Sequence, residues 1–298
     1  RVICSPLPSS LSSADVYASG GGFNCATATN INVPVQECYQ IQAFYSANGW
    51  SNWTNKTNRD TDTNICTWYG VGCTNMSGQD TITSLSLANN GFVWSSLSYL
   101  TVLTWFTYID LSDNQLNTSL DGSWGSLVNL TGLNLSNTQI YGTLPSGWST
   151  LTNLTNLDLS NNKLYGSVPG SWTAGLTDRQ SIYIDLTNNC ITTTGYTTPE
   201  QSWLTANVTM SPQNICLIYM TNTSEGTFSG SSADTVVQIV ASGANGTPVE
   251  IQARPWYSFS QWSDSSTDNP RTDLAVTGTR IITAVMSSFY TLSYNAWS

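Results

Sequence analysis

The sequence has few charged side chains and no histidine. Only 9% of its 298 residues are charged, Lys56 and Lys163 are its only lysines, and 8 basic residues stand against 18 acidic ones. Without histidine, the commonest general base and a common zinc ligand are missing. We therefore expect no enzyme, no metal site and no cofactor. The net charge of −10, with no basic cluster, also excludes the electrostatic footprint of a nucleic-acid-binding protein.

Long apolar runs are missing as well. No stretch reaches the 18 apolar residues of a transmembrane helix, although 40% of the residues are hydrophobic. Ser, Thr, Asn and Gly supply the polarity instead, which favours a secreted or surface protein. The sequence starts at Arg1 with neither Met nor an apolar leader, so we expect a mature chain whose targeting segment has been removed.

A repeat fills the middle of the sequence. Paired apolar residues recur at Leu85/Leu87, Ile109/Leu111, Leu133/Leu135, Leu157/Leu159 and Ile184/Leu186. The first three steps are 24 residues long and the last is 27. A fixed period of this size predicts a solenoid, in which each pair lies on the inner face of a short strand.

A polar residue follows each pair at a constant offset. Three residues after the second apolar residue stand Asn90, Asn114, Thr138, Asn162 and Asn189. A buried Asn can hydrogen-bond the backbone where the chain leaves the strand, and successive Asn side chains can form a ladder. Thr138 can provide only part of these bonds.

This pattern resembles the plant-type extracellular leucine-rich repeats, LxxLxLxxNxLxGxIPxxLxxLxx. Trp124, Trp148 and Trp172 stand where that pattern has its late Leu, and we expect them to stack in the core on the convex side. The runs Gly142–Pro145 and Gly166–Pro169 are predicted to turn the chain along its outer face, because Pro prevents helix continuation. The resemblance implies a solenoid of five repeats.

The segment before the repeats resembles the N-terminal cap of the same family. The sequence Cys66-Thr-Trp-Tyr-Gly-Val-Gly-Cys73 has the form CxWxGVxC, which implies a Cys66–Cys73 disulfide. The family usually has a second cap disulfide, in which Cys38 would pair with Cys25 or Cys4. Ile41–Tyr45 has helical spacing, and Gly49 marks the end of that helix.

Two further cysteines follow the repeats. We predict a Cys190–Cys216 disulfide that closes the C-terminal end of the solenoid. Seven cysteines leave one thiol that is free, buried or paired between molecules.

Alternation replaces the 24-residue period from Leu217. It predicts strands at Val236–Val240, Pro248–Gln252, Tyr257–Trp262 and Ile281–Val285. Residues 251–264, with Asn269-Pro270 after them, resemble the Listeria–Bacteroides repeat, a small β-grasp-like domain of bacterial surface proteins. That resemblance implies a mostly-β domain with Tyr257, Phe259 and Trp262 in its core.

The predicted organisation has six parts. They are an arm (1–37, with an edge strand at Ile31–Gln36), a cap (38–81), the repeats (82–191), a C-terminal cap (192–216), the β-grasp-like domain (217–288) and a terminal strand (289–298). The terminal strand either folds back on its own sheet or adds to the edge of another molecule.

One set of outward strand positions is a candidate binding face. It consists of Tyr108, Asp110, Asn134, Asp158, Tyr183 and Asp185. Because adjacent strands lie about 4.8 Å apart, Asp110, Asn134, Asp158 and Asp185 would form one column on the concave face, where solenoids hold ligands. A solvated polar face without a ligand is the alternative.

Asn-x-Ser/Thr motifs occur ten times, where chance gives about eight. We predict N-linked glycans within the set Asn52, Asn55, Asn75, Asn117, Asn129, Asn153, Asn207, Asn222 and Asn245. Asn129 and Asn153 lie one repeat apart in Asn-Leu-Thr, a place where plant-type repeats often carry glycans. The tenth motif, at Asn134, falls on the concave face and is left out.

The sequence supports two functional hypotheses. The first is a secreted, glycosylated structural or adhesive subunit of an extracellular fibre or coat, which would polymerise with itself through the arm and the terminal strand. The second is a recognition module that binds a peptide or carbohydrate ligand on the concave face.

Overall fold

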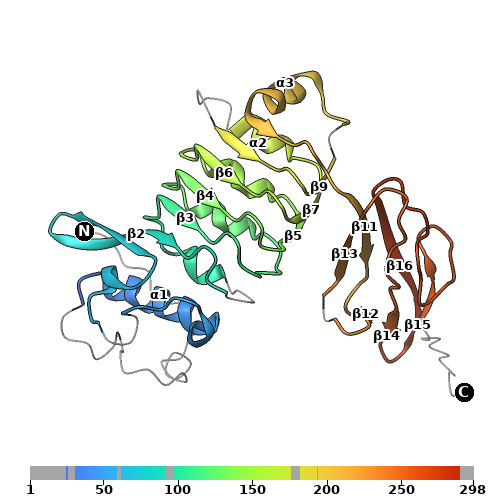
Figure 1. The fold of residues 1–298 in the computed structure, drawn as a ribbon, viewed down its shortest axis with the longest axis horizontal. Coiled ribbons are helices and arrows are strands. Elements are labelled where there is room, and N and C mark those ends of the chain that lie inside the picture. Colours follow the sequence, from blue (N-terminus) through green and yellow to red (C-terminus); the bar gives the residue numbers. More distant parts are fainter. Residues whose placement is uncertain are drawn as a thin grey trace, which may run out of the picture. The chain divides into compact units, whose positions relative to one another are not determined.

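The computed structural model describes residues 25, 31–58, 62–91, 97–175, 182–192, 194–231 and 233–288 (Figure 1). The chain forms two compact units, which divide between Ser211 and Pro212. Cys4, most of the predicted arm and the terminal segment 289–298 lie outside the described residues. Within the described ranges, no helix has the length and hydropathy needed to cross a bilayer.

Unit 1 begins with a helical cap. Its elements are α1 (Val35–Ala47), the 3-10 turns η1 (Trp50–Asn52) and η2 (Ile65–Thr67), and the hairpin of β1 (Val71–Met76) and β2 (Gln79–Ser86). The predicted edge strand at Ile31–Gln36 is wrong, because α1 begins at Val35 with Pro34 as its N-cap residue. The fixed φ of proline is suited to a helix start as well as to an edge strand.

Two disulfides join parts of the cap. Cys25 is bonded to Cys38, and Cys66 is bonded to Cys73. Glu37 is nearly buried, and its carboxylate accepts a hydrogen bond of 2.7 Å from the backbone N–H of Ile82 on β2. The cap therefore contacts the first strand of the repeats through a specific polar bond as well as through apolar packing.

A seven-stranded sheet forms one face of the solenoid. After β2 its strands are β3 (Tyr108–Asp110), β4 (Gly132–Asn134), β6 (Asn156–Asp158), β8 (Tyr183–Asp185) and β10 (Val208–Thr209). From β2 onward neighbouring strands are parallel, and the register places Ile109, Leu133, Leu157 and Ile184 side by side. The repeat alignment deduced from the sequence is confirmed.

A second sheet lies where the sequence predicted only turns. It contains the parallel strands β5 (Tyr141–Thr143), β7 (Lys163–Gly166) and β9 (Cys190–Ile191). Gly142 and Gly166 have φ values of 93° and 81°, a conformation that glycine adopts without steric cost. These glycines predict turns, yet the residues on either side of them form β-sheet pairs with the corresponding residues of the adjacent repeat.

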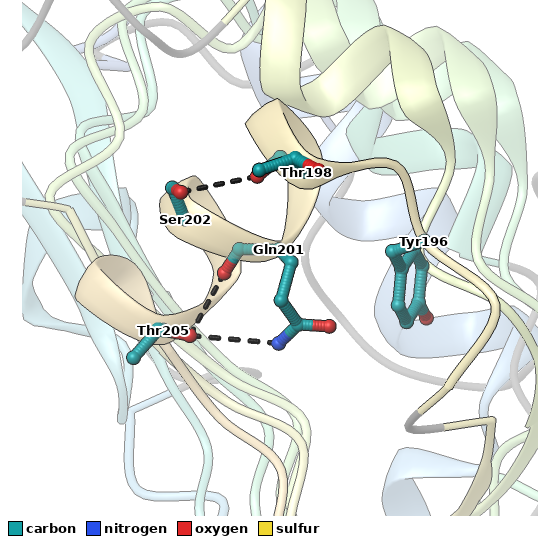
Figure 2. Close-up of a pocket in the computed structure, with 5 residues that line it drawn as sticks. All are labelled: Tyr196, Thr198, Gln201, Ser202 and Thr205. Carbon is teal, nitrogen blue, oxygen red and sulfur yellow. Dashed lines mark hydrogen bonds between the residues drawn. The ribbon is translucent and has the colours of Figure 1, made fainter.

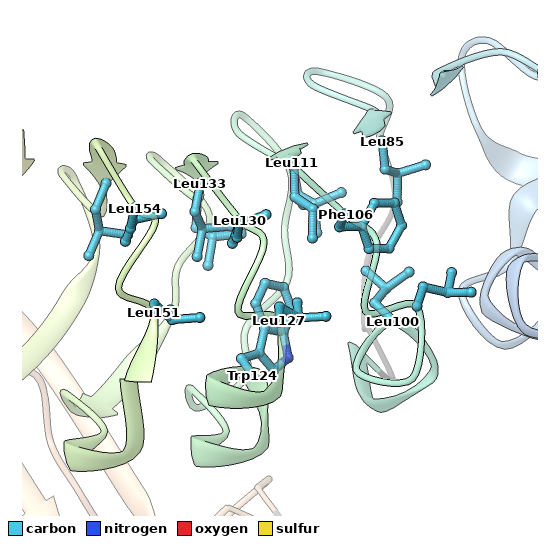
Figure 3. Close-up of a cluster of buried hydrophobic side chains, with 14 of the residues drawn as sticks. Leu85, Leu100, Phe106, Leu111, Trp124, Leu127, Leu130, Leu133, Leu151 and Leu154 are labelled. Atoms are coloured by element: carbon cyan, nitrogen blue, oxygen red, sulfur yellow. The ribbon is translucent and has the colours of Figure 1, made fainter. Parts of the chain in front are cut away.

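Short helical segments complete each repeat. They are η3 (Leu97–Leu100), η4 (Gly122–Ser126), η5 (Ser146–Thr150) and α2 (Gly170–Gly175), and α3 (Thr198–Asn207) follows the last repeat. The core lies between these segments and the seven-stranded sheet, and Figure 3 shows leucines of successive repeats lying in layers there. Trp124, Trp148 and Trp172 are buried and stack with ring centroids 6.1 and 6.3 Å apart.

The predicted Asn ladder is present. The amide nitrogen of Asn114 lies 2.9–3.0 Å from the carbonyl oxygens of Leu87, Leu111 and Ser112, which belong to two adjacent repeats. Thr138 reaches only its own repeat's Leu135 carbonyl and the side chain of Asn162. The ladder therefore continues through the third repeat with fewer bonds.

Unit 2 is a β structure. Its strands are β11 (Ile215–Met220), β12 (Gly226–Phe228), β13 (Thr235–Val240), β14 (Ile251–Ala253), β15 (Tyr257–Trp262) and β16 (Arg280–Ser288). They form a four-stranded sheet in the order β13-β11-β16-β15 and a separate pair, β12-β14. The central strands β11 and β16 are parallel, and their outer neighbours are antiparallel to them.

Unit 2 differs from its predicted outline at two points. The first strand, β11, starts at Ile215, so the unit begins at Pro212 and not at 217. The predicted strand at Pro248–Gln252 is displaced to Ile251–Ala253. Trp262 is fully buried and Phe259 packs against the core, whereas the β-grasp-like identity of the unit stays a prediction.

An ion network around the buried Arg271 stabilises unit 2. The Arg271 guanidinium donates two bonds of 2.7 Å to Asp264, and bonds of 2.8 and 2.7 Å to Asp273. Tyr219 donates a 2.6 Å bond to Asp273, and Arg271 also lies over the ring of Trp262. Burial, and this bond to the carboxylate, raise the pKa of Tyr219. The network joins β11, β15 and the loop before β16. We therefore interpret it as a structural feature of unit 2.

Candidate functional site

The exposed side of the seven-stranded sheet carries the residues of the predicted binding face, and we call it the sheet face. Strand alternation turns Ile109, Leu133, Leu157 and Ile184 inward, so their neighbours on each side point outward. The register then arranges the outward residues in rows across the strands.

Two rows cross the central strands. The first contains Tyr108, Gly132, Asn156 and Tyr183, and the second contains Asp110, Asn134, Asp158 and Asp185. The structure thus places all six residues of the sequence-predicted face on one side of one sheet. Gly132 and Asn156 complete the first row.

The tyrosines bracket the first row. Tyr108 is 41% exposed and Tyr183 is 50% exposed. They are three strand spacings apart, or about 14 Å. A Cβ added to Gly132 would lie 2.7 Å from Cδ2 of Tyr108, so the Tyr108 ring leans onto this glycine. Between the two rings, Asn156 is exposed.

The second row has a local structural role. Oδ1 of Asp110 accepts bonds of 3.0 and 2.6 Å from the backbone N–H and the hydroxyl of Ser112. Asp158 accepts from the N–H of Ser160 in the same way. These Asx turns hold each Asp side chain in place where the chain leaves its strand. The second carboxylate oxygen of each Asp therefore points in a fixed direction.

Each tyrosine is coupled to a carboxylate. The hydroxyls of Tyr108 and Tyr183 donate long bonds of 3.4 and 3.3 Å to Oδ2 of Asp110 and Asp185. Burial and the charge of Asp110 raise the pKa of Tyr108. Tyr108 is therefore a neutral hydrogen-bonding group at physiological pH. No described Lys or Arg belongs to either row, so the sheet face is acidic.

A pocket missed by sequence reasoning lies beside α3. It has a volume of about 460 Å³ and is lined by Tyr196, Thr198, Gln201, Ser202 and Thr205. Figure 2 shows the Tyr196 ring facing the Gln201 side chain, while the hydroxyls of Ser202 and Thr205 bond to carbonyls of α3. Its lining residues carry no charge, and the Tyr196 hydroxyl is already bonded to the backbone of Thr192 and Val168.

The remaining predicted residues fall elsewhere. Asn52, Asn75, Asn117, Asn222 and Asn245 are exposed, whereas Asn55, Asn129, Asn153 and Asn207 are half-buried. Cys190 and Cys216 are both disulfide-bonded, and their pairing with each other stays a prediction. The described residues hold no group of three or more Cys, Asp or Glu side chains arranged for a metal ion.

Comparison with known proteins agrees with the repeat architecture. The family model "Leucine Rich Repeat" matches residues 129–151 and 153–174. These matched residues lie within a leucine-rich repeat solenoid of parallel strands. No curated protein is significantly similar to the chain in sequence.

Several solved structures are similar to part of the chain. The leucine-rich repeat ectodomain of the receptor kinase SOBIR1 from Arabidopsis thaliana has 22% identity and a TM-score of 0.47, over 61% of this chain and 92% of that one. The BIR2 ectodomain from the same plant has 18% identity and a TM-score of 0.45, over 61% and 95%. A plant ice-binding protein has 21% identity and a TM-score of 0.48, over 61% and 65%.

Proposed function

We propose that unit 1 is a non-catalytic recognition module that binds an extended ligand along the sheet face. The proposal rests on the arrangement of the two rows. Two exposed tyrosines lie about 14 Å apart at the ends of the first row, and the neighbouring row carries carboxylates and an amide. Aromatic residues with polar neighbours are the groups that dominate binding surfaces.

The chemistry of the face indicates the ligand class. Asp110, Asp158 and Asp185 supply three carboxylates without a basic partner in either row. Such a face favours a ligand that offers hydrogen-bond donors and positive charge. We therefore propose an extended peptide with Lys or Arg side chains in preference to a neutral oligosaccharide. Each carboxylate already anchors a turn through Oδ1, which suits binding better than proton transfer.

The disulfides indicate the compartment. Two are present in the cap, and Cys190 and Cys216 are also oxidised. Disulfides persist mainly in oxidising compartments. We infer a secreted or cell-surface location, where a peptide ligand would be met.

A binding screen tests the proposal. The probes are arrays of eight-residue peptides with and without Lys and Arg, together with neutral oligosaccharides. We expect binding to basic peptides that weakens as salt increases and is lost when Asp110, Asp158 and Asp185 are changed to Asn. A control with equal net charge neutralises three exposed acids of unit 2, Asp234, Glu250 and Asp268. Selective binding of oligosaccharides, or equal loss in the control, would refute the ligand class.

Self-association is a second candidate, because β13 lies at the edge of its sheet. Thr235–Val240 carries no charge, and no described strand pairs with its outer side. Such an edge is a template for another strand. Changing Ile239 on this edge to Lys should lower the molar mass measured by light scattering at high concentration. Ile281→Lys on the central strand β16, at a similarly exposed position, should leave it unchanged.

A further inference from the structure

An apolar patch is exposed on the turns that lead into β3 and β4. Val102 is 53% exposed, Trp105 is 50% exposed and Val128 is 44% exposed. Tryptophan has a large apolar surface that is costly to leave in water. An exposed group of large apolar side chains marks a surface that something covers.

The repeat register places a glycosylation motif next to this patch. Asn129 follows Trp105 by one 24-residue step, so the two occupy equivalent positions in adjacent turns. The turns run side by side, since the side-chain amide of Asn129 donates a 2.9 Å bond to the Thr104 carbonyl and the N–H of Thr131 donates a 2.8 Å bond to the Thr107 carbonyl. The Asn129 amide therefore lies next to the backbone of Trp105, whose side chain is exposed.

We propose that Asn129 carries an N-linked glycan whose first sugar packs on Trp105 and covers the patch. In the transfer, Nδ2 of Asn129 forms a bond to the anomeric carbon of a sugar that is carried on a lipid diphosphate. The bond from that carbon to the diphosphate oxygen breaks, the lipid diphosphate leaves with the electron pair, and Nδ2 loses one proton. Asn129, Leu130 and Thr131 supply the Asn-x-Thr motif that directs this reaction.

The folded geometry accommodates the modified side chain. A glycosylated amide keeps one N–H, which suffices for the bond to Thr104. The C–H face of a pyranose ring can then lie on the indole while its hydroxyls remain in water. Neither turn contains a charged residue that would favour a different occupant.

The next repeat provides a matched control. Asn153 stands in the same Asn-Leu-Thr motif, is half-buried, and donates a 2.7 Å bond to the Val128 carbonyl. Its equivalent in the preceding repeat is Asn129 and not an aromatic residue. A glycan on Asn153 therefore has no indole to cover.

The test uses the full chain secreted from a eukaryotic host. Glycopeptide mass spectrometry should find a glycan on Asn129. Asn129→Gln should raise the binding of an apolar fluorescent dye at least threefold, whereas Asn153→Gln should not. Adding Trp105→Ala to Asn129→Gln should remove the increase. An unmodified Asn129, or equal dye binding by the two Gln variants, overturns the proposal.

A second pair of variants separates the effect of losing the glycan from the effect of losing the Asn amide hydrogen bond. Thr131→Val and Thr155→Val each erase one motif while they keep both Asn side chains. Each also loses one equivalent hydroxyl bond to the preceding repeat, of 2.8 and 3.0 Å respectively. Dye binding should rise only for Thr131→Val, and a rise in both or in neither contradicts the proposal.

Discussion

The Asn162 side chain joins two adjacent repeats through several hydrogen bonds. Its Oδ1 accepts from the N–H groups of Thr138 and Ile140, at 3.1 and 2.9 Å, and it is 2% exposed. Asn162→Ala would leave both buried N–H groups without a partner. Each such group costs about 1–3 kcal/mol, so we expect a loss of about 2–6 kcal/mol in the free energy of unfolding. Domains of this kind have about 5–15 kcal/mol in total.

Thr138→Ala is the matched control for this prediction. The Thr138 hydroxyl bonds the Leu135 carbonyl and Asn162 Oδ1, and both of these keep other partners. Its removal should cost about 1 kcal/mol. Urea unfolding followed by the fluorescence of the stacked tryptophans measures both variants. Equal losses near 1 kcal/mol would show that the Asn ladder does not carry the cohesion between repeats.

Three further predictions concern the core and two titrating groups. Trp148→Ala removes the middle ring of the stack and should cost about 3–5 kcal/mol in urea unfolding. Burial raises the pKa of Glu37, so its stabilising contribution is present below pH 4.5 and is lost as the pH rises through the folded pKa. Glu37→Gln, which keeps an acceptor for the Ile82 N–H, should remove this fall in stability above pH 4.5. The Arg271 bonds lower the pKa of Asp264 from 3.8 to about 2, so that stabilisation is present above pH 3.8 and is lost as the pH falls towards 2. Arg271→Met should restore an ordinary Asp264 pKa, as measured by NMR titration.

The sequence predicted the repeat strands because each carries two independent signals. The inward pair Leu157/Leu159 marks the strand, and Asn162 marks its exit. The sheet-face rows follow from the repeat alignment, with two steps of 24 residues and a last step of 27. The lean of Tyr108 onto Gly132 could not be predicted, since it depends on a side-chain rotamer.

Other elements were missed for different reasons. Helix α3 begins with the capping box Thr197-Thr-Pro-Glu200, in which Glu200 accepts bonds from Thr197. The sequence analysis predicts a C-terminal cap over 192–216 but no helix within it. The ion network around Arg271 could not be predicted from a local pattern, because Tyr219 on β11 lies 54 residues from Asp273, the residue that accepts its hydrogen bond. Such long-range polar pairing is fixed by the tertiary fold.

The affinity of a double tyrosine variant tests the recognition proposal most directly. The basic peptide selected in the screen would be titrated calorimetrically against Tyr108→Ala/Tyr183→Ala and against the control Trp105→Ala/Trp256→Ala, which removes two exposed aromatic side chains outside the sheet face. If the bracketed row is the binding site, the tyrosine variant should lose at least about 2 kcal/mol, or roughly 30-fold in affinity, while the control binds as the wild type. Unchanged binding by the tyrosine variant would contradict the assignment of the sheet face as the site.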